Sequence, residues 1–380
     1  MKTYFFFAMV AIVLTYIAFV TWRRRPSVNF RSVDAIIPAY NEGPVLETSL
    51  RNLIANPYFR KVIVVDDGSK DETYAIALRL QAEFPDRVLA LTQANTGKGG
   101  ALMHGIAHAT CDQVFLTDAD TYVPPDESIG YMLAEIEAGA DAVGGIPSSN
   151  LNGAGWLPHI RATVKLPMII LKRTFQQMLG GAPFIISGSC GMFKTQLLRE
   201  FPFSDRTKVE DLDLTWTLVK AGKKIRQANR CIVYPQECNT LREEYRRWRR
   251  WIVGFAVCMR LHSDLLFTRF GLFSIMPMFL LVVFGVAIYA LSWAKTLPSV
   301  GPLGIAYSLF PLLWVAVVMV MGVISAIHHR KPFLPLLAPL AIGYVLMAYA
   351  IWIVHGIAGL ITGREPNRDK PTRYAYNVAR

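Results

Sequence analysis

The stretch Lys61-Val-Ile-Val-Val-Asp-Asp-Gly-Ser-Lys-Asp71 carries the clearest fold signal in this chain. Its run of β-branched apolar residues predicts a buried strand over Lys61–Val65. Acidic residues and a glycine end this strand, and an amphipathic pattern over Glu72–Glu83 predicts a helix directly after it. A buried strand, a tight turn and a helix in this order form the repeating unit of a parallel sheet.

The same unit recurs on both sides of that stretch. Further strands are predicted at Val33–Pro38, Val88–Thr92 and Gln113–Leu116, and a further helix at Val45–Ile54. The alternation predicts an α/β domain with a mainly parallel, Rossmann-like sheet over residues 30–240. We expect its functional side chains to gather where the strands end.

The first residues of the chain predict a membrane anchor. The run Tyr4–Trp22 is apolar and long enough to cross about 30 Å of hydrocarbon. A signal peptide would carry more positive charge before this run and a small-residue cleavage site after it, whereas Arg23, Arg24 and Arg25 follow here. We therefore expect a retained anchor, with the N-terminus outside and the next domain in the cytosol.

The C-terminal part is also predicted to be in or on a membrane. Tyr245–Leu261 has the pattern of an amphipathic helix that lies at the lipid interface, and three apolar segments follow at about 271–293, 303–327 and 333–362. Three crossings would export the basic tail Arg364–Arg380, against the positive-inside tendency. Either the tail is exported or one segment does not cross, and the sequence leaves both outcomes open.

The predicted organisation has five parts. They are an N-terminal transmembrane anchor (1–24), a cytosolic α/β domain (30–240), an interfacial amphipathic region (241–268), C-terminal transmembrane segments (269–363) and a basic tail (364–380). We therefore expect an integral protein of a bacterial-type inner or plasma membrane, with its α/β domain in the cytosol.

The composition indicates which kinds of partner this protein binds. The formal net charge is +12, but the basic residues cluster beside the apolar segments, which indicates contact with anionic lipid rather than with nucleic acid. The five cysteines form no Cys-x-x-Cys pair, which argues against a zinc site.

Four acidic motifs mark a candidate site. In chain order they are Pro38-Ala-Tyr-Asn-Glu42, Val65-Asp-Asp-Gly-Ser-Lys-Asp71, Asp118-Ala-Asp120 and Val209-Glu-Asp-Leu-Asp213. Any one of them could be only a turn with a helix cap. Three of them, however, end strands of one predicted sheet, so we expect them to face a common crevice.

The spacing of Asp118 and Asp120 predicts a metal site. In an extended segment two side chains at this spacing point the same way. Two carboxylates on one side suit a hard divalent cation, Mg2+ or Mn2+, that also holds phosphate oxygens. Such a metal would offset the charge of a leaving diphosphate.

A glycine-rich segment adds a cation to this site. Asn95-Thr-Gly-Lys-Gly-Gly-Ala101 is predicted to be a loop that opens a helix and brings Lys98 close to phosphate, although its spacing is not that of a P-loop. His104 and His108 are one helical turn apart, but the glutamate of a His-Glu-x-x-His motif is missing. We interpret these two histidines as ordinary helix residues.

Taken together, the ordered motifs resemble those of the family 2 glycosyltransferases, which have the GT-A fold. The closest likeness is to membrane synthases of poly-N-acetylglucosamine, chitin oligosaccharide, hyaluronan and cellulose. The resemblance covers about residues 30–260, and Glu210-Asp-Leu-Asp-Leu-Thr-Trp216 is similar to the acceptor-site motif of the poly-N-acetylglucosamine branch.

The resemblance implies a role for each candidate residue. Asp211 would be the catalytic base and Asp120 the metal ligand. Donor-binding residues would be Tyr40, Glu42, Asp67, Lys98, Asp118 and Arg250, and acceptor-binding residues Ser189, Glu210 and Trp251. The donor would be a nucleotide sugar, with uridine diphosphate expected, and the acceptor a carbohydrate or a lipid-linked sugar. A carboxylate base agrees with the chemistry, because a sugar hydroxyl keeps its proton at neutral pH.

One departure from the family pattern affects the acceptor. Processive members carry Gln-x-x-Arg-Trp on the interfacial helix, and here Arg247-Trp-Arg-Arg-Trp251 has an arginine in place of the glutamine. The resemblance implies that Arg250 binds diphosphate and Trp251 stacks on the acceptor sugar. The other interpretation is that these arginines bind only lipid headgroups.

Two main functions stay open at this point. One is an inverting synthase that extends a polysaccharide or oligosaccharide and takes part in its translocation. The other adds a single sugar to a polyprenyl phosphate or another lipid. A transporter or sensor with a degenerate domain is disfavoured by the intact Asp67, Asp118, Asp120 and Asp211. A nucleotidyltransferase would not explain Glu210-Asp211 followed by an interfacial helix.

Overall fold

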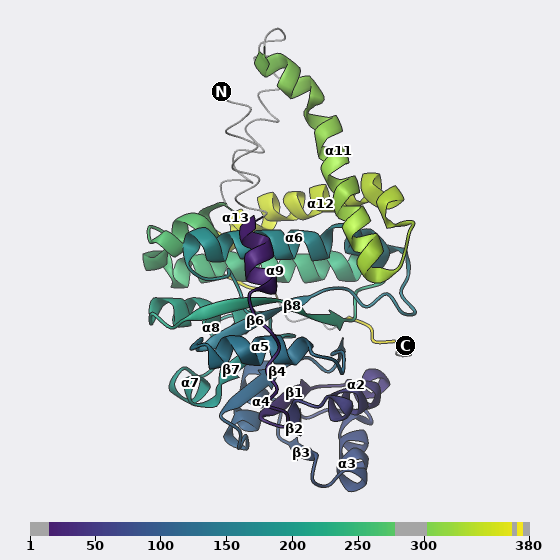
Figure 1. The fold of residues 1–380 in the computed structure, drawn as a ribbon, viewed down its shortest axis with the longest axis vertical. Coiled ribbons are helices and arrows are strands. Elements are labelled where there is room, and N and C mark those ends of the chain that lie inside the picture. The colour runs from purple at the N-terminus through teal and green to yellow at the C-terminus, as the bar shows by residue number, and fades with distance from the viewer. Residues whose placement is uncertain (1–14, 278–301, 367–370, 375–380) are drawn as a thin grey trace. The chain divides into compact units, whose positions relative to one another are not determined.

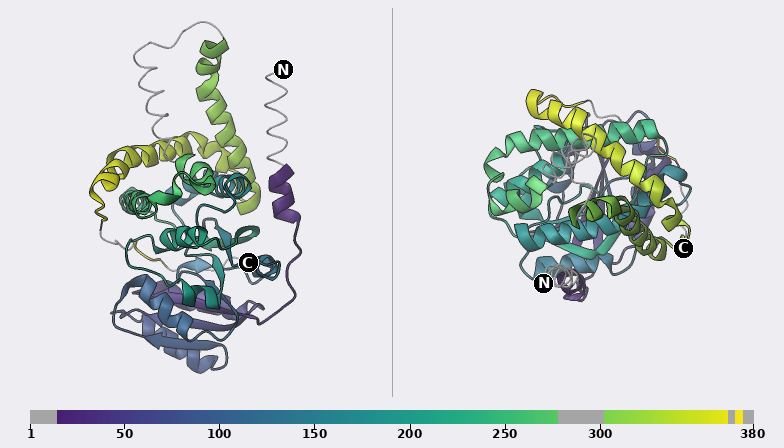
Figure 2. Two further views of the ribbon diagram at one scale, coloured as in Figure 1. Left: turned by 90° about the vertical axis from the view of Figure 1, so that its left-hand side faces the viewer. Right: turned by 90° about the horizontal axis from the view of Figure 1, so that it is seen from above.

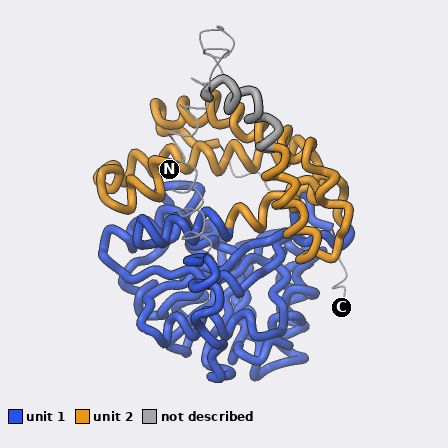
Figure 3. Tube along the Cα trace, turned by 45° about the horizontal axis from the view of Figure 1, so that its top comes forward, with its two compact units in different colours: residues 1–153, 170–237, 370–380 blue, residues 154–169, 238–369 orange. Residues whose placement is uncertain are grey.

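The computed structural model describes residues 15–277, 302–366 and 371–374. The chain divides into two compact units, which are considered separately (Figure 3). The first contains residues 1–153, 170–237 and 370–380, and the second residues 154–169 and 238–369. Most of the predicted N-terminal anchor and much of the segment 271–293 lie outside the described residues, although residues 15–22 are helical.

The first unit is built on a twisted sheet of eight strands (Figure 1). The strands lie in the order β3-β2-β1-β4-β7-β6-β8-β5. Their bounds are β1 Val33–Ala39, β2 Phe59–Asp66, β3 Val88–Thr92, β4 Gln113–Leu116, β5 Thr121–Tyr122, β6 Ala142–Pro147, β7 Gly191–Lys194 and β8 Ile225–Pro235. The four strands predicted from the sequence are confirmed, and they are the parallel half of this sheet.

The other half of the sheet mixes directions. Strand β7 is antiparallel to both β4 and β6, whereas β8 is parallel to β6 and antiparallel to β5. The sheet is therefore mainly parallel where the acidic motifs lie and mixed beyond β4. This is the mixed α/β arrangement of a GT-A-like fold.

Helices cover both faces of the parallel half. Residues alternate along β2, so that Val62 and Val64 join the core with Leu46 of α2, while Ile63 and Val65 lie against Gly105 of α4. The helices of this unit are α2 Gly43–Ala55, α3 Thr73–Glu83, α4 Gly97–Ala107, α5 Ser128–Glu137, α7 Thr195–Glu200 and α8 Glu210–Lys220. Helix α6, Trp156–Gly180, has its first part in the second unit and its last part in the first.

The second unit is helical. It contains the amphipathic α9 (Leu241–Leu261), the short turns η1 (Ser263–Leu265) and η2 (Gly271–Ile275), α11 (Pro302–His329), η3 (Leu334–Leu337), α12 (Ala338–Ile351), η4 (Trp352–Gly356) and α13 (Ile357–Thr362). Thr240 caps α9 by accepting a hydrogen bond from the Glu243 amide at 3.3 Å. The predicted amphipathic helix at Tyr245–Leu261 is thus part of α9.

The last helical stretch of this unit runs continuously from Leu334 to Thr362. Among the described residues it is the one helix with the length and apolar composition needed to cross a membrane. It packs beside α9, where the Phe255 and Trp352 rings are 5.8 Å apart and Arg260 Nη1 donates to the Ile361 carbonyl at 2.9 Å. Helix α11 runs at a steep angle to α12 in both side views (Figures 1 and 2). Leu334–Thr362 therefore packs beside the amphipathic helix, and its first part also contacts α11, where Val318 joins Ala338 and Ala341 in a small apolar cluster.

Candidate active site

Three of the acidic motifs meet at one edge of the sheet, as predicted. Glu42 follows β1, Asp66 ends β2 and Asp67 follows it, and Asp118 follows β4. The parallel pairing sets Ala39 beside Asp66, so these strand ends lie level with one another. The sheet topology therefore brings together carboxylates that are far apart in the sequence: Glu42 and Asp120 are separated by 78 positions.

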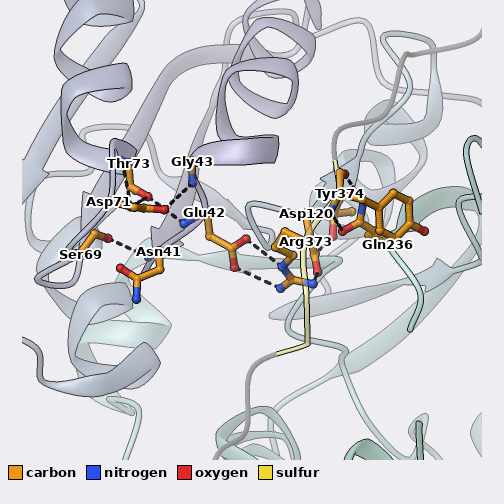
Figure 4. Close-up of polar contacts among 11 residues, drawn as sticks. Asn41, Glu42, Gly43, Ser69, Asp71, Thr73, Asp120, Gln236, Arg373 and Tyr374 are labelled. Atoms are coloured by element: carbon orange, nitrogen blue, oxygen red, sulfur yellow. Dashed lines mark hydrogen bonds and ion pairs between the residues drawn. The ribbon is translucent and has the colours of Figure 1, made fainter. Parts of the chain in front are cut away.

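Hydrogen bonds from the second motif fix the direction of Glu42. Asn41 has a positive φ of 51°, and its amide donates to Ser69 Oγ at 2.9 Å. The Glu42 amide donates to Thr73 Oγ1 at 2.7 Å, and Thr73 is held in turn by Asp71 (Figure 4). Part of the Asp-Asp-Gly-Ser-Lys-Asp motif thus builds the loop that carries Glu42.

Asp67 holds the start of α4. Its Oδ1 accepts from the Thr96 amide and its Oδ2 from the Gly97 amide, both at 2.9 Å, and Gln93 Nε2 donates to Oδ1. Gly97 has a φ of 84°, a backbone conformation that favours glycine. The predicted glycine-rich loop that opens a helix is confirmed, and Asp67 is its cap. Its role toward a nucleotide stays a prediction.

Lys98 lies at the centre of the acidic cluster. Its Nζ is 2.5 Å from Asp118 Oδ1 and 3.7 Å from Glu210 Oε1. A Cβ built on Gly188 would lie 2.7 Å from the same Nζ and 3.4 Å from Asp211 Oδ2, so only glycine fits this position without displacing Lys98. Lys98 thus links the predicted donor carboxylate Asp118 to the motif that contains the predicted base.

Asp211 is placed by backbone amides at the start of α8. Its Oδ2 accepts from the Gly188 amide and its Oδ1 from the Leu212 amide, both at 2.9 Å. Burial raises the pKa of Asp211, and the neighbouring Glu210 raises it further, while Lys98 and the Gly188 amide oppose these effects. A carboxylate with a raised pKa is a stronger base, which suits proton abstraction.

A buried arginine that the motifs did not reveal supports the loop beside Asp211. Arg173 of α6 donates to Ser187 Oγ at 2.8 Å and to the Gly145 carbonyl at 3.1 Å. Thr117 fixes the same loop by donating to the Ser189 carbonyl at 3.0 Å. Ser189, the predicted acceptor residue, is buried within this loop. No sequence signal pointed to Arg173, because nothing local distinguishes it from other basic residues of an amphipathic helix.

The surroundings of Asp120 correct one expectation. Asp118 and Asp120 were expected to point the same way along an extended segment, but the Thr121 amide donates to the Asp118 carbonyl and the chain turns between them. Asp118 therefore pairs with Lys98, whereas Asp120 pairs with Arg373. Burial raises the pKa of Asp120 to about 6, although Arg373 opposes this shift.

The cation on Asp120 comes from the C-terminal tail. Arg373 was predicted only to be part of a basic tail, yet its guanidinium contacts Asp120 and Glu42 in the first unit (Figure 4). The contact shows that these two carboxylates form a place where a cation is held. No group of three His, Cys, Asp or Glu side chains suited to a metal occurs in the described part of the chain, so a metal here would need further oxygens from the donor or from water.

The candidate residues of α9 belong to the second unit. Arg247 pairs with the buried Glu244, and its guanidinium lies 5.3 Å from the centre of the Trp251 ring. Arg161 also contacts Glu244, at 3.1 Å, and lies 5.4 Å from the same ring. Arg250 is partly buried on the same helix. The predicted roles of Arg250 toward the donor and of Trp251 toward the acceptor stay predictions.

Two further candidates lie near these motifs. Tyr40 directly follows β1 and is 37% exposed, and Glu210 is buried with its Oε1 3.7 Å from Lys98 Nζ. Their predicted roles toward donor and acceptor stay predictions. His104 bonds to Gln93 and His108 to the His104 carbonyl, as expected for ordinary helix residues. All five cysteines are free thiols.

A GT-A-like sheet with carboxylates and a lysine at its strand ends, and a carboxylate at the start of α8, defines a glycosyltransferase that uses a nucleotide sugar. The comparisons agree. The chain belongs to glycosyltransferase family 2: that family model matches residues 34–201. The glycosyltransferase YaiP of Escherichia coli (strain K12) is 65% identical over 380 residues, covering 100% of this chain and 95% of that protein.

More distant relatives are also similar. Poly-beta-1,6-N-acetyl-D-glucosamine synthase of Staphylococcus aureus (strain COL) is 30% identical over 240 residues, which cover 61% of this chain and 57% of that enzyme. The match therefore spans little more than half of that relative. The solved mannosyltransferase PcManGT of Pyrobaculum calidifontis, in complex with GDP-Man and Mn2+, has a TM-score of 0.56 and 20% identity over 94% of this chain and 98% of its own. This likeness supports the fold.

Proposed function

We propose that this enzyme is a membrane-embedded, inverting glycosyltransferase that moves a sugar from a uridine diphosphate donor to a growing polysaccharide or oligosaccharide at the cytosolic face. The observation that carries the proposal is the position of Asp211. Its Oδ2 accepts from the Gly188 amide at 2.9 Å, and a Cβ at Gly188 would lie 3.4 Å from that oxygen and 2.7 Å from Lys98 Nζ, which pairs with Asp118. A base and a donor site are thus adjacent.

Asp211 would act as the general base. The acceptor hydroxyl must lose its proton as it attacks the anomeric carbon, and a positioned carboxylate typically accelerates such a step about 10²–10⁴-fold. Attack from the face opposite the departing diphosphate inverts the configuration at that carbon. Lys98 carries a positive charge beside Asp118 and Glu210. This charge would stabilise the negative charge that develops on the leaving diphosphate.

Asp120 would bind the Mg2+ or Mn2+ ion that accompanies the diphosphate. The donor set is suitable, since Asp120 and Glu42 are hard oxygen ligands that already hold the guanidinium of Arg373. When bound, the metal would offset the charge of the diphosphate as it leaves. Asp118 and Lys98 would orient the donor beside it.

The proposed acceptor is a carbohydrate chain, supported by the similarity to the poly-beta-1,6-N-acetyl-D-glucosamine synthase over the shared 240 residues. Trp251 would stack on the acceptor sugar and Arg250 would contact the diphosphate. The alternative acceptor is a polyprenyl phosphate or another lipid. Arg247 favours this alternative, because its guanidinium lies over the Trp251 ring at the position where the processive pattern has glutamine.

The C-terminal tail supports a particular membrane arrangement. Arg373 contacts Glu42 of the α/β domain, so the tail lies on the same side of the membrane as that domain. One of the three apolar segments would then not cross. Leu334–Thr362 is the proposed one, because it packs beside the amphipathic α9 and would lie with it in the interface.

The experiment is product analysis with detergent-solubilised enzyme and a panel of nucleotide sugars. We expect one uridine diphosphate sugar to be consumed and its sugar to appear in a chain, with loss of transfer in excess chelator. A single transferred sugar on a lipid would support the alternative acceptor. No transfer from any donor with either acceptor class would contradict the proposal.

A further inference from the structure

The C-terminal tail contributes a cation to the strand ends of the α/β domain. Arg373 Nε lies 2.8 Å from Glu42 Oε2, and its Nη2 lies 3.1 Å from Glu42 Oε1. Its third nitrogen, Nη1, lies 2.5 Å from Asp120 Oδ2 (Figure 4). One planar guanidinium thus bridges two carboxylates through a fork on one side and a single contact on the other.

A pair of amide contacts holds this part of the tail in place. The Tyr374 amide donates to Gln236 Oε1 at 3.4 Å, and Gln236 Nε2 donates to the Tyr374 carbonyl at 2.6 Å. Gln236 directly follows β8, and its own amide donates to the Asp120 carbonyl at 3.0 Å. Gln236, which holds the tail at Tyr374, is therefore also hydrogen-bonded to the backbone of Asp120, the residue whose carboxylate pairs with Arg373.

The three charged side chains are largely removed from solvent. Their exposed fractions are 14% for Arg373, 7% for Glu42 and 10% for Asp120. Two buried carboxylates without a cation would be strongly unfavourable, so the arginine stabilises this arrangement. Asp120 Oδ2 contacts Arg373 and Oδ1 accepts from Thr121 Oγ1 at 3.2 Å, so both of its oxygens are engaged.

We infer that Arg373 and a divalent cation compete for Asp120. The tail residues Thr372, Arg373 and Tyr374 hold the carboxylate pair when the metal and donor are absent, and Arg373 leaves Asp120 when the metal binds. The inference rests on the proposed function, which supplies the metal. It adds that the tail of this chain opposes metal binding and thereby limits entry to the donor site.

The test is a titration with Mn2+ of the full chain in detergent, without nucleotide, in which free Mn2+ is followed by electron paramagnetic resonance. If the arginine-bound form is about nine-tenths populated or more, it lowers the apparent metal affinity at least ~10-fold. Arg373→Met should therefore bind Mn2+ at least ~10-fold more tightly than the wild type. Arg364→Met removes the same charge from an exposed position at the start of the tail and should leave the affinity unchanged.

A further variant keeps the inference testable if Arg373→Met does not fold. Gln236→Met loosens the clamp on Tyr374 and keeps all three charges, so it should also tighten Mn2+ binding, and combining it with Arg373→Met should add little. Equal affinity in the wild type and in both variants would overturn the inference, as would loss of Mn2+ binding in Arg373→Met. Sugar transfer by the wild type, measured separately, shows whether the proposed function itself holds.

Discussion

At the scale of single residues, the chemistry depends on how one carboxylate is held. Asp211 accepts hydrogen bonds from two backbone amides, and a Cβ at its neighbour Gly188 would lie 2.7 Å from Lys98 Nζ. The sequence motif identified Asp211 as the candidate base; the two amides explain why the carboxylate has one direction, and burial beside Glu210 explains why its pKa is raised. The two facts lead to predictions about turnover and about its pH dependence.

Replacing Asp211 with asparagine should lower kcat by roughly 10²–10⁴-fold, because the amide cannot accept the proton. Nucleotide affinity should change little, since the substitution is nearly isosteric and the donor side is untouched. Single-turnover rates and nucleotide titrations on the same preparation measure both quantities. Turnover near the wild-type value would remove Asp211 from the role of base.

The acid limb of the pH–rate profile should lie above the range of an ordinary aspartate, whose pKa is about 3.9. Burial and Glu210 raise the pKa of Asp211, so its base form is lost at a higher pH as the solution is acidified. Initial rates measured between mildly acidic and neutral pH locate this limb. The residual activity of Asp211→Asn should lack it, and an acid limb retained by this variant would assign it to another group.

At the scale of elements, two contacts between helices and the sheet decide the geometry of the site. Helix α4 carries Lys98 and approaches β1 and β2 closely at Gly105. Helix α6 carries Arg173, which holds the Ser187–Ser189 loop and through it the amide that contacts Asp211. We expect the close approach at Gly105 to affect the stability of the domain and the contact of Arg173 to affect catalysis.

Gly105→Ala should destabilise the α/β domain by about 1–3 kcal/mol, the usual cost of overpacking a core. A Cβ at this position would lie 2.5 Å from Ile36 Cγ2 and 3.2 Å from Val65 Cγ2, so the helix must move away from the sheet. Gly99→Ala, on the same helix, would approach only to 3.4 Å from Phe203 Cβ and is the matched control. Thermal melts in detergent should show a lower midpoint for Gly105→Ala alone; equal midpoints for both would contradict the packing argument.

Arg173→Met should lower kcat on the order of 10- to 100-fold with a small change in the KM for the donor, because a misplaced base costs rate rather than donor binding. The hydrogen bond from the Gly188 amide lowers the pKa of Asp211. If Arg173→Met displaces the loop and this hydrogen bond is lost, the pKa rises and the acid limb of the pH–rate profile should move to higher pH. Lys172→Met removes the adjacent half-buried cation, which lies 4.9 Å from the Phe184 ring centre, and is the control. An unchanged acid limb in Arg173→Met would show that Arg173 does not position the base.

At the scale of the whole molecule, the tail would restrict how the chain crosses a membrane in the arrangement proposed above. Because Arg373 contacts Glu42, the tail and the α/β domain would share one side of that membrane. A chain with an N-terminal anchor then needs an even number of later crossings. The sequence contains three apolar segments after α9, so one of them is expected to stay on that side.

Reporter fusions test this arrangement. A fluorescent protein that folds only in the cytosol should fluoresce at the C-terminus of the full chain, whereas alkaline phosphatase, active only after export, should be inactive there. A phosphatase fused after residue 300, beyond the first of the three segments, should be active and serves as the control. An active phosphatase at the C-terminus would contradict the shared side.

The parallel half of the sheet and the motifs at its strand ends could be predicted from the amino-acid sequence alone. Strand and helix periods are local properties, so the runs around Val62–Val65 and Glu72–Glu83 predicted their elements before any packing was known. Asp118, Asp120 and Asp211 were found in the same way, as short motifs with a chemical meaning. The mixed half of the sheet was not predicted, because the direction in which β7 pairs depends on its neighbours rather than on its own residues.

The partners of these carboxylates, by contrast, became known only from the folded chain. Arg373 is separated from Glu42 by 331 positions, and Arg173 reaches the loop beside Asp211 from a different helix. Neither arginine is marked by a motif, since a contact between distant positions has no local pattern and forms only when the sheet and the tail are packed together. The cations that pair with Asp118 and Asp120 likewise come from other segments, Lys98 from α4 and Arg373 from the tail. The largely buried Asp120 needs such a partner, because an unpaired buried charge is strongly unfavourable.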